Sequence, residues 1–493
     1  MLANQFELKD EQKSLKSYTK KTVNILCGKL WIKILNFPHA SINGNEVTCK
    51  QLKNCNCKID IAIHTQSLVN PAHYSIFTLE SKVICFYKFD STLSQIKMAI
   101  KFIFYFSLVI IIYSYVGYGL LLLVLVTIKK LFNAKNVRQQ DAAFQPPVTI
   151  IIAAYNEADF IEDKIKNTLA LDYPSDKLKI IIITDGSTDK TPEIVARYPS
   201  IRLLHQPGRS GKIAAMHRAM GFVNTPFVIY CDANTYLNTD AIKNIVRHYA
   251  DKKVGGVAGE KKIMQLGNAG VSGAGEGLYW KYESTLKQLD SNLYTVVGAA
   301  GELFSVRTEL YEFPGENVLL DDFIISLRIC ARGYRVAYEK QAYAMETASA
   351  NLKEERKRKI RISAGAFQSM LMLKGLLNVF KHPMLTFQYV SHRVLRWTLC
   401  PLLLPLLFIS NILLLNEYPV IIYQLIFAGQ LAFYGAVLAG WLFSLRGIKV
   451  KILYFPYYFF FINLSLYLGF FRFLKGNQSV LWEKAVRKKV QEA

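Results

Sequence analysis

Apolar positions after residue 97 follow two patterns, long unbroken stretches and short runs. Four stretches come close to or exceed the roughly 20 apolar residues that a helix needs to cross a bilayer. They are Phe102–Ile128, Leu399–Leu415, Val420–Phe443 and Ile452–Phe471. This pattern predicts a transmembrane anchor at 98–130, a more polar central segment, and about three transmembrane helices within 397–475.

Short apolar runs in the central segment alternate with segments of helical period. The runs have the length of buried parallel strands and are Val148–Ala153, Lys179–Thr184, Ile201–Leu204 and Phe227–Cys231. The segments of helical period are Glu157–Leu169, Asp189–Arg197 and Lys212–Gly221. This alternation predicts an α/β fold with a mostly parallel, doubly wound sheet that binds its ligand at the carboxyl ends of the strands. We place this domain at 145–365.

A broken apolar stretch, Ile362–Phe380, follows the α/β pattern. Lys374 and Gly375 interrupt it, so it is too discontinuous to span a membrane. It is either an amphipathic helix lying along the membrane face, in a region 366–396, or a core helix of the α/β domain. The sequence leaves both open.

The first 97 residues differ from the rest of the chain. They contain no arginine, no apolar span and no sustained period, whereas Met98 opens a segment that resembles a start with a signal anchor. We expect 1–97 to be a leader outside the functional protein, and the alternative is a small accessory domain.

Charge places the chain at a membrane. The formal net charge is +23, although 52% of residues are hydrophobic. Lys129 and Lys130 follow the first span and predict a cytoplasmic α/β domain in a multi-pass protein of the cell (inner) membrane. Nucleic-acid binding is not expected, because the basic residues flank apolar spans and no such motif occurs. One conflict arises: three later spans would put the basic tail, 476–493, outside. Either the last stretch is re-entrant or interfacial, or the charge rule fails there.

Three aspartates suit a nucleotide-diphosphate sugar, which needs a nucleoside anchor, charge compensation and a base for the acceptor hydroxyl. Asp185 can accept hydrogen bonds from base or ribose, and Asp232 can hold a divalent cation with Asn234 as a neutral oxygen donor. Asp322 can take the acceptor's proton. Each alone is more often a helix cap, so the argument depends on the ordered set.

The segment Val148–Gly365 resembles glycosyltransferase family 2, and within it the membrane synthases of β-linked polysaccharides (cellulose, hyaluronan, chitin, poly-N-acetylglucosamine). The matching motifs are Ala153-Ala-Tyr-Asn-Glu, Thr184-Asp-Gly-Ser-Thr-Asp, Gly211-Lys-Ile-Ala-Ala-Met-His-Arg-Ala, Asp232-Ala-Asn and Asp321-Asp322. Gly298-Ala-Ala-Gly-Glu corresponds to the family's turn near the acceptor.

The resemblance implies a nucleotide-diphospho-sugar transferase (GT-A-type) domain with inverting chemistry. It implies Asp322 as the catalytic base, with Asp321 pointing elsewhere or only positioning its loop. Asp232 and Asn234 are the implied ligands of Mg²⁺ or Mn²⁺. The implied substrate-binding residues are Ala154, Tyr155, Glu157, Asp185, Lys212, Asp232, Gly301, Glu302 and Arg361. For Glu302 two roles stay open, binding of acceptor hydroxyls and capping of the next element.

Two motifs depart from the family pattern. Asn234 replaces the second aspartate of the metal motif. The signature Gln-x-x-Arg-Trp is here Arg358-Lys-Ile-Arg-Ile, which keeps Arg361 for the diphosphate but loses the glutamine and the tryptophan. In the family this tryptophan caps the acceptor. Because it is lost here, the resemblance does not imply processive chain growth.

Together these features predict a membrane glycosyltransferase of polysaccharide biosynthesis. It would use a nucleotide-sugar donor, most simply a UDP-sugar, and a glycan or lipid-linked acceptor among membrane lipids. Assembly with other polysaccharide export proteins is a further expectation. The alternatives are transfer of a single sugar to a lipid carrier and a non-catalytic nucleotide-binding assembly subunit.

Overall fold

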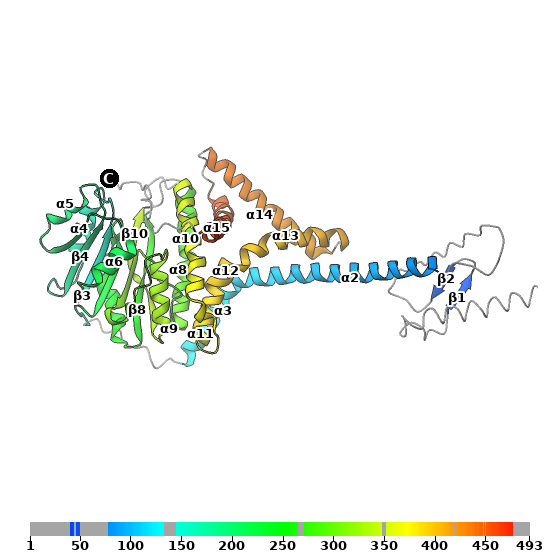
Figure 1. Cartoon of the computed structure of the whole chain (residues 1–493), viewed down its shortest axis with the longest axis horizontal. Helices are drawn as coiled ribbons and strands as arrows, with labels where there is room; N and C mark the ends of the chain where they lie inside the picture. Colours follow the sequence, from blue (N-terminus) through cyan, green and yellow to red (C-terminus); the bar gives the residue numbers. More distant parts are fainter. Residues whose placement is uncertain are drawn as a thin grey trace, which may run out of the picture. The chain divides into compact units, whose positions relative to one another are not determined.

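The short apolar runs form the strands of an eight-stranded mixed sheet in the computed structural model (Figure 1). The structure describes residues 40–43, 46–49, 77–132, 144–264, 271–347, 352–418, 420–446, 448 and 450–476. The strands are β3 (Val148–Ala154), β4 (Leu178–Asp185), β5 (Ile201–Gln206), β6 (Phe227–Asp232), β7 (Tyr236–Leu237), β8 (Val254–Met264), β9 (Leu303–Arg307) and β10 (Arg335–Thr347).

The strand order is β5-β4-β3-β6-β9-β8-β10-β7. The four strands predicted from sequence are mutually parallel, with Ala153 of β3 opposite Asp232 of β6 and Ala154 opposite Thr184 of β4. The predicted parallel sheet is therefore confirmed. β9 lies antiparallel between β6 and β8, and β8 pairs in parallel with β10.

Each face of the sheet carries its own apolar core, because successive side chains of a strand point to opposite faces. Along β3, Ile150 and Ile152 pack into one core, whereas Ile151 and Ala153 pack into the other. The helices of the domain are α4 (Ile161–Leu169), α5 (Thr191–Ala196), α6 (Lys212–Met220), α7 (Ala241–Val246), α8 (Val271–Leu293) and α9 (Asp321–Ala331), with short 3₁₀ turns η2 (Arg247–Ala250) and η3 (Thr308–Leu310).

The first helix after β3 starts later than predicted. We expected it from Glu157, but α4 begins at Ile161. Asn156 adopts a left-handed backbone with a φ of 54°, and the Glu157 carbonyl accepts the N–H groups of Phe160 and Ile161 in a turn. The strand therefore ends in a tight turn that leaves the following residues at the sheet edge.

Among the described residues, four helices are long and apolar enough to cross a membrane: Leu93–Phe132, Leu399–Glu417, Ile421–Leu445 and Ile452–Leu474. They agree with the four predicted stretches. The first consists of α2 (Phe77–Ile112), a π-helical turn η1 (Tyr113–Gly117) and α3 (Tyr118–Phe132), and the others are α13 (Leu399–Glu417), α14 (Ile421–Leu445) and α15 (Lys451–Leu474). The chain is a membrane protein.

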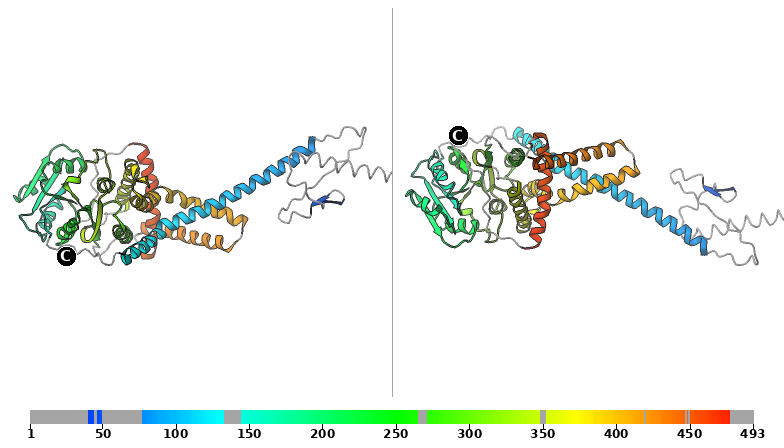
Figure 2. Two further views of the ribbon diagram at one scale, coloured as in Figure 1. Left: turned by 90° about the horizontal axis from the view of Figure 1, so that it is seen from below. Right: turned by 90° about the horizontal axis from the view of Figure 1, so that it is seen from above.

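The helices do not all run the same way. In Figure 2, α13 and α14 extend away from the α/β domain, whereas α15 runs crosswise to them along the domain. Its backbone packs closely on α10 (Leu352–Met372), because a Cβ atom added at Gly469 would lie 2.4 Å from Cβ of Ser363. The last apolar helix is thus also a packing partner of the domain.

The broken stretch after the domain fits neither prediction alone. One helix, α10, runs through the expected boundary at 365, and it is followed by η4 (Lys374–Leu377), α11 (Pro383–Tyr389), η5 (Val390–Val394) and α12 (Leu395–Trp397). Leu373 and Leu376 are buried in the domain core, as the core alternative requires. Leu371 and Phe380 are exposed, Phe380 by 95%, as the interfacial alternative requires.

Residues Met1–Phe89 form a separate compact unit. In it, β1 (Ala40–Asn43) pairs antiparallel with β2 (Glu46–Cys49), and Ala40 lies opposite Cys49. Most of the expected leader lies outside the described residues, so its role stays a prediction.

Candidate active site

The predicted site residues converge at the carboxyl edge of the parallel strands. A cavity of about 710 Å³ opens there, and its lining includes Glu157, Lys212, Asp232, Asn234, Gly301, Glu302, Asp321, Asp322 and Arg361. Ala154, Tyr155 and Asp185 lie apart from this group and line a small adjoining pocket, which also contains Arg209 and Lys212. The two pockets share Lys212, so the predicted set forms one continuous site.

Asp185 is held rigidly at the end of β4. Its Oδ2 accepts hydrogen bonds from the backbone N–H groups of Ser210 (3.0 Å) and Gly211 (2.6 Å). Gly211 has a φ of 98°, which favours glycine, so the loop can turn its amides toward the carboxylate. Only 5% of Asp185 is exposed, and its Oδ1 has no hydrogen-bond partner among the described residues. Beside it, the Arg209 guanidinium lies 3.7 Å from the ring centroid of Tyr155.

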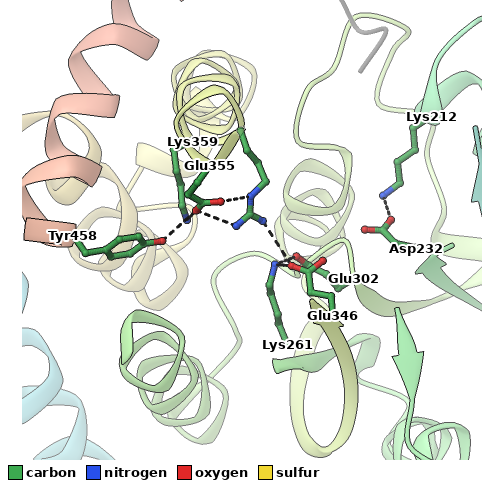
Figure 3. Close-up of polar contacts among 9 residues, drawn as sticks. Lys212, Asp232, Lys261, Glu302, Glu346, Glu355, Lys359 and Tyr458 are labelled. Carbon is green, nitrogen blue, oxygen red and sulfur yellow. Dashed lines mark hydrogen bonds and ion pairs between the residues drawn. The ribbon is translucent and has the colours of Figure 1, made fainter. Parts of the chain in front are cut away.

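Lys212 begins α6 and points to the end of β6. Its Nζ lies 2.6 Å from Asp232 Oδ1 (Figure 3). Burial alone would lower the pKa of the Lys212 ammonium, but the carboxylates of Asp232, Asp321 and Asp322 hold this pKa above its ordinary value. The lysine therefore stays charged where the small pocket beside Asp185 meets the larger cavity.

Asp322 lies in the first turn of α9, across the cavity from β6. A Cβ atom added at Gly301 would lie 3.5 Å from both Asp322 Oδ2 and Lys212 Nζ, so the carboxylate and the ammonium both approach this small residue. Burial, and then the charge of Asp321, raise the pKa of Asp322 to about 7. The N-cap of α9 is Leu320, so Asp322 does not cap this helix.

Asp321 does not point elsewhere, which was one of our two expectations, and the other, that it only positions its loop, stays a prediction. It lines the same cavity, it is buried, and its Oδ2 has no hydrogen-bond partner within the described part of the chain. Its charge helps to keep Lys212 and Arg361 protonated, since it raises the pKa of both. Both aspartates thus place a carboxylate in the cavity, and the pKa of Asp322 is raised.

Glu302 belongs to a buried ion-pair network (Figure 3). Its Oε1 lies 2.5 Å from Lys261 Nζ, and the same ammonium contacts Glu346. Burial would raise the pKa of Glu302, but Lys261 holds it below its usual range. Glu302 lines the cavity while it is paired, so neither free acceptor binding nor capping describes its main contact. Arg358 joins the same network through Glu346 (3.8 Å).

Arg361 is the residue that this chain keeps from the family signature, and it lines the cavity together with its neighbours in positions 358–362. Among the described residues no hydrogen bond or ion pair to Arg361 is formed. Burial lowers its pKa from the usual value, although Asp321 and Asp232 oppose this. Its guanidinium is therefore a cation whose hydrogen-bonding capacity is directed at the cavity.

Helix α10 also fixes the loop in front of the two aspartates. A Cβ atom at Gly365 would lie 2.9 Å from Leu319 and 2.8 Å from Leu320, so the helix and the loop approach closely. Gln368 accepts the Leu319 N–H (3.1 Å) and donates to the Asn317 carbonyl (2.6 Å). The position of Asp322 thus depends on a helix that the sequence pattern assigned to the membrane region or the core.

Sequence reasoning missed one side of the cavity. The missed lining residues are Trp280, Glu283, Lys287, Arg393, Trp397 and Arg472, from α8, η5, α12 and α15. No motif marks them. The sequence feature that could have indicated them is the spacing of Trp280, Glu283 and Lys287, which places these three residues on one face of a helix.

Comparison with known proteins assigns the fold and the domain. Residues 149–311 match the family model described as glycosyl transferase family 2. The chain carries a family 2 glycosyltransferase domain. This domain has the GT-A fold: the structure is similar to that of the mannosyltransferase PcManGT from Pyrobaculum calidifontis in complex with GDP-Man and Mn²⁺, with a TM-score of 0.56, 22% identity, and coverage of 76% of this chain and 99% of that one.

Two curated relatives of the glycosyltransferase domain are named as synthases of different products. A poly-β-1,6-N-acetyl-D-glucosamine synthase of Staphylococcus aureus (strain MSSA476) is 28% identical over 236 residues, which is 45% of this chain and 55% of the relative. A β-monoglucosyldiacylglycerol synthase of Nostoc sp. is 28% identical over 200 residues, 37% of this chain and 41% of the relative. The chain thus spans about half the length of the curated relatives it matches.

Proposed function

We propose that this membrane protein transfers a sugar from a nucleotide-diphosphate sugar, most simply a UDP-sugar, to a glycan or lipid-linked acceptor. The observation that carries the proposal is the approach of both Asp322 and Lys212 to Gly301 in a cavity that Asp232 and Arg361 also line. A base, an acceptor space and cations for a diphosphate thereby meet in one site.

The donor would lie along the strand ends. The unpaired Oδ1 of Asp185 can accept a hydrogen bond from the nucleobase or the ribose, since a buried carboxylate oxygen without a partner is costly. Lys212 and Arg361 face the neighbouring space and would offset the charge that develops on the departing diphosphate.

Asp322 would act as the general base. A pKa of about 7 lets its carboxylate accept a proton near neutral pH, which is the condition for efficient base catalysis. The deprotonated acceptor oxygen then attacks the anomeric carbon as the bond to the diphosphate breaks. If the two oxygens lie on opposite sides of that carbon, its configuration inverts.

Asp232 and Asn234 would hold Mg²⁺ or Mn²⁺. Within the described residues no three or more His, Cys, Asp or Glu side chains form a closed metal cluster. One carboxylate and one amide fit the open type of site, because Mg²⁺ is commonly bound by one or two carboxylates together with substrate phosphates and water. When bound, the cation neutralises charge on the diphosphate.

The acceptor has two candidates within this function. The Staphylococcus relative, named for a polymer, supports a glycan, and assembly with export proteins would follow from that. The Nostoc relative, named for a glycolipid, supports addition of one sugar to a lipid. Ile362 stands where the family signature has tryptophan. This loss alone does not decide between processive growth and addition of one sugar. Lys129 and Lys130 support a cytoplasmic catalytic domain in either case.

Membranes that contain the protein, incubated with a panel of labelled UDP-sugars, test this function. We expect one sugar to enter a product whose size and solvent partition distinguish polymer from glycolipid. Nucleotide-sugar binding without turnover would instead support the non-catalytic assembly subunit, and no binding at all would reject the proposal.

A further inference from the structure

One wall of the cavity has no part in the proposed handling of the donor. It is built from two helical segments that are far apart in the sequence. Trp280, Glu283 and Lys287 lie on one face of α8, and Arg393 and Trp397, four residues apart, come from η5 and α12. Both segments line the same cavity as Asp322. This wall therefore borders the space in which an acceptor must meet the base.

Lys287 is the unusual group in this wall. It is only 4% exposed, yet it lines the cavity and forms no hydrogen bond or ion pair with the part of the chain that the structure describes. Its nearest aromatic contacts are loose, with Nζ 5.6 Å from the Trp280 ring centroid and 6.0 Å from that of Tyr338. A buried ammonium without a hydrogen-bond acceptor is destabilising, so this side chain points to an oxygen atom supplied by a ligand.

The charges around Lys287 limit what that ligand can be. Burial, and then Arg393, lower its pKa to about 8, while Glu283, Glu302 and Asp322 oppose this. Arg393 is already paired with Glu283 at 2.9 Å. A phosphate is usually met by several unpaired cations, whereas a single ammonium suits a hydroxyl or carbonyl oxygen of a neutral molecule.

Trp397 supplies the apolar part of the wall. Its ring packs against Phe323, with centroids 5.2 Å apart, and Phe323 directly follows Asp322 in α9. The Arg393 guanidinium lies 5.6 Å from the indole centroid. A sugar presents C–H groups on its faces and oxygens at its rim, so an aromatic surface beside a hydrogen-bond donor is suited to hold one. Phe323 links the position of this surface to that of the base.

Trp397 also indicates how the acceptor reaches the site. It ends α12, and Leu399 begins the apolar helix α13. Tryptophan is enriched at the membrane–water interface, where one part of its ring system is apolar and one is polar. The wall therefore lies where a headgroup held by the membrane can enter the cavity.

We propose that Trp397 and Lys287 form the acceptor subsite and that it binds the terminal neutral sugar of a membrane-held acceptor. The sugar ring lies on Trp397, and an oxygen atom of one of its substituents accepts a hydrogen bond from Lys287. The attacking hydroxyl faces Asp322. This assignment rests on the proposed function, because it needs a glycosyl donor in the same cavity.

The test compares variants in native membranes with the labelled UDP-sugar that the wild type uses. Trp397→Ala and Lys287→Met are each expected to lower incorporation of label into product by about tenfold or more, while donor affinity stays within twofold. Trp397→Phe keeps an aromatic surface and should retain most incorporation. Trp441→Ala is the matched control, because Trp441 is 46% exposed on α14 and lies outside the cavity lining.

Several outcomes would overturn the subsite. Incorporation by both variants within twofold of wild type would do so, and so would an equal fall in donor affinity, which indicates a disturbed fold or donor site. A product that releases its sugar in mild acid would identify a sugar phosphate and a phosphate acceptor. Label in a solvent-extractable glycolipid or in a polymer supports the subsite and identifies the source of the sugar. Absence of any wild-type turnover would refute the proposed function itself.

Discussion

Replacement of Asp322 by asparagine tests the catalytic assignment most directly. The side chain keeps its shape and loses its basicity, so transfer should fall by about 10²–10⁴ while donor affinity persists. The competing explanation is a structural role at the start of α9. In that case asparagine would be nearly neutral, because asparagine serves at helix N-termini about as well as aspartate.

The catalytic assignment of Asp322 also predicts how kcat/KM changes with pH. Burial and the charge of Asp321 raise the pKa of Asp322 to about 7. A general base acts in its ionised form, so activity rises with pH through that value and is lost below it. At pH 6 about one tenth of the carboxylate is ionised, and kcat/KM should be about tenfold below its plateau. An ordinary aspartate would give no change between pH 6 and 8.

The assay is kcat/KM for the donor between pH 5.5 and 8.5, since this constant reports groups of the free enzyme. Wild type should show the rising limb, and Asp322→Asn should lose both the rate and the limb. Asp321→Asn is the matched control. It should cost less activity and move the limb to lower pH, because the charge of Asp321 raises the pKa of its neighbour. A flat wild-type profile, or comparable transfer by Asp322→Asn, would refute the reasoning.

Three further predictions concern the support of the site. Excess chelator should abolish turnover and Mg²⁺ or Mn²⁺ should restore it, and Asn234→Asp should retain or strengthen metal dependence; full activity in chelator would exclude this role. Gly298→Ala should destabilise the fold by about 1–3 kcal/mol in thermal unfolding, because Gly298 has a φ of 86° and an added Cβ would lie 2.1 Å from Phe323. Gln368→Leu should lower transfer more than donor affinity, because it frees the loop before Asp321; equal losses in both measurements would contradict a positioning role.

The half of the site to which we assign the donor could be predicted because its information is local. Apolar runs fix β3, β4 and β6, and parallel strands put their carboxyl ends at one edge. Asp185 and Asp232 follow or end those strands in the sequence, so their convergence needs no long-range information. The family motifs added Lys212 and Asp322 at positions that the cavity brings together.

The remaining features depend on contacts between distant segments. The antiparallel strand β9 lies between β6 and β8. The local pattern of apolar residues does not indicate this position. The pairing of Glu302 with Lys261 depends on that arrangement, since β8 carries the lysine. Lys287 and Trp397 meet the cavity from helices more than a hundred positions apart, and neither lies in a motif.

The crosswise course of α15 changes how the crossings of the membrane are counted. This helix runs along the domain and crosswise to α13 and α14, with Gly469 packed on α10 and Arg472 in the cavity lining. If α15 does not cross the membrane, the remaining candidate spans are one before the α/β domain and two after it, α13 and α14. Two passages would bring the chain back to the side on which the domain lies, which is what the interfacial alternative for the last apolar stretch requires.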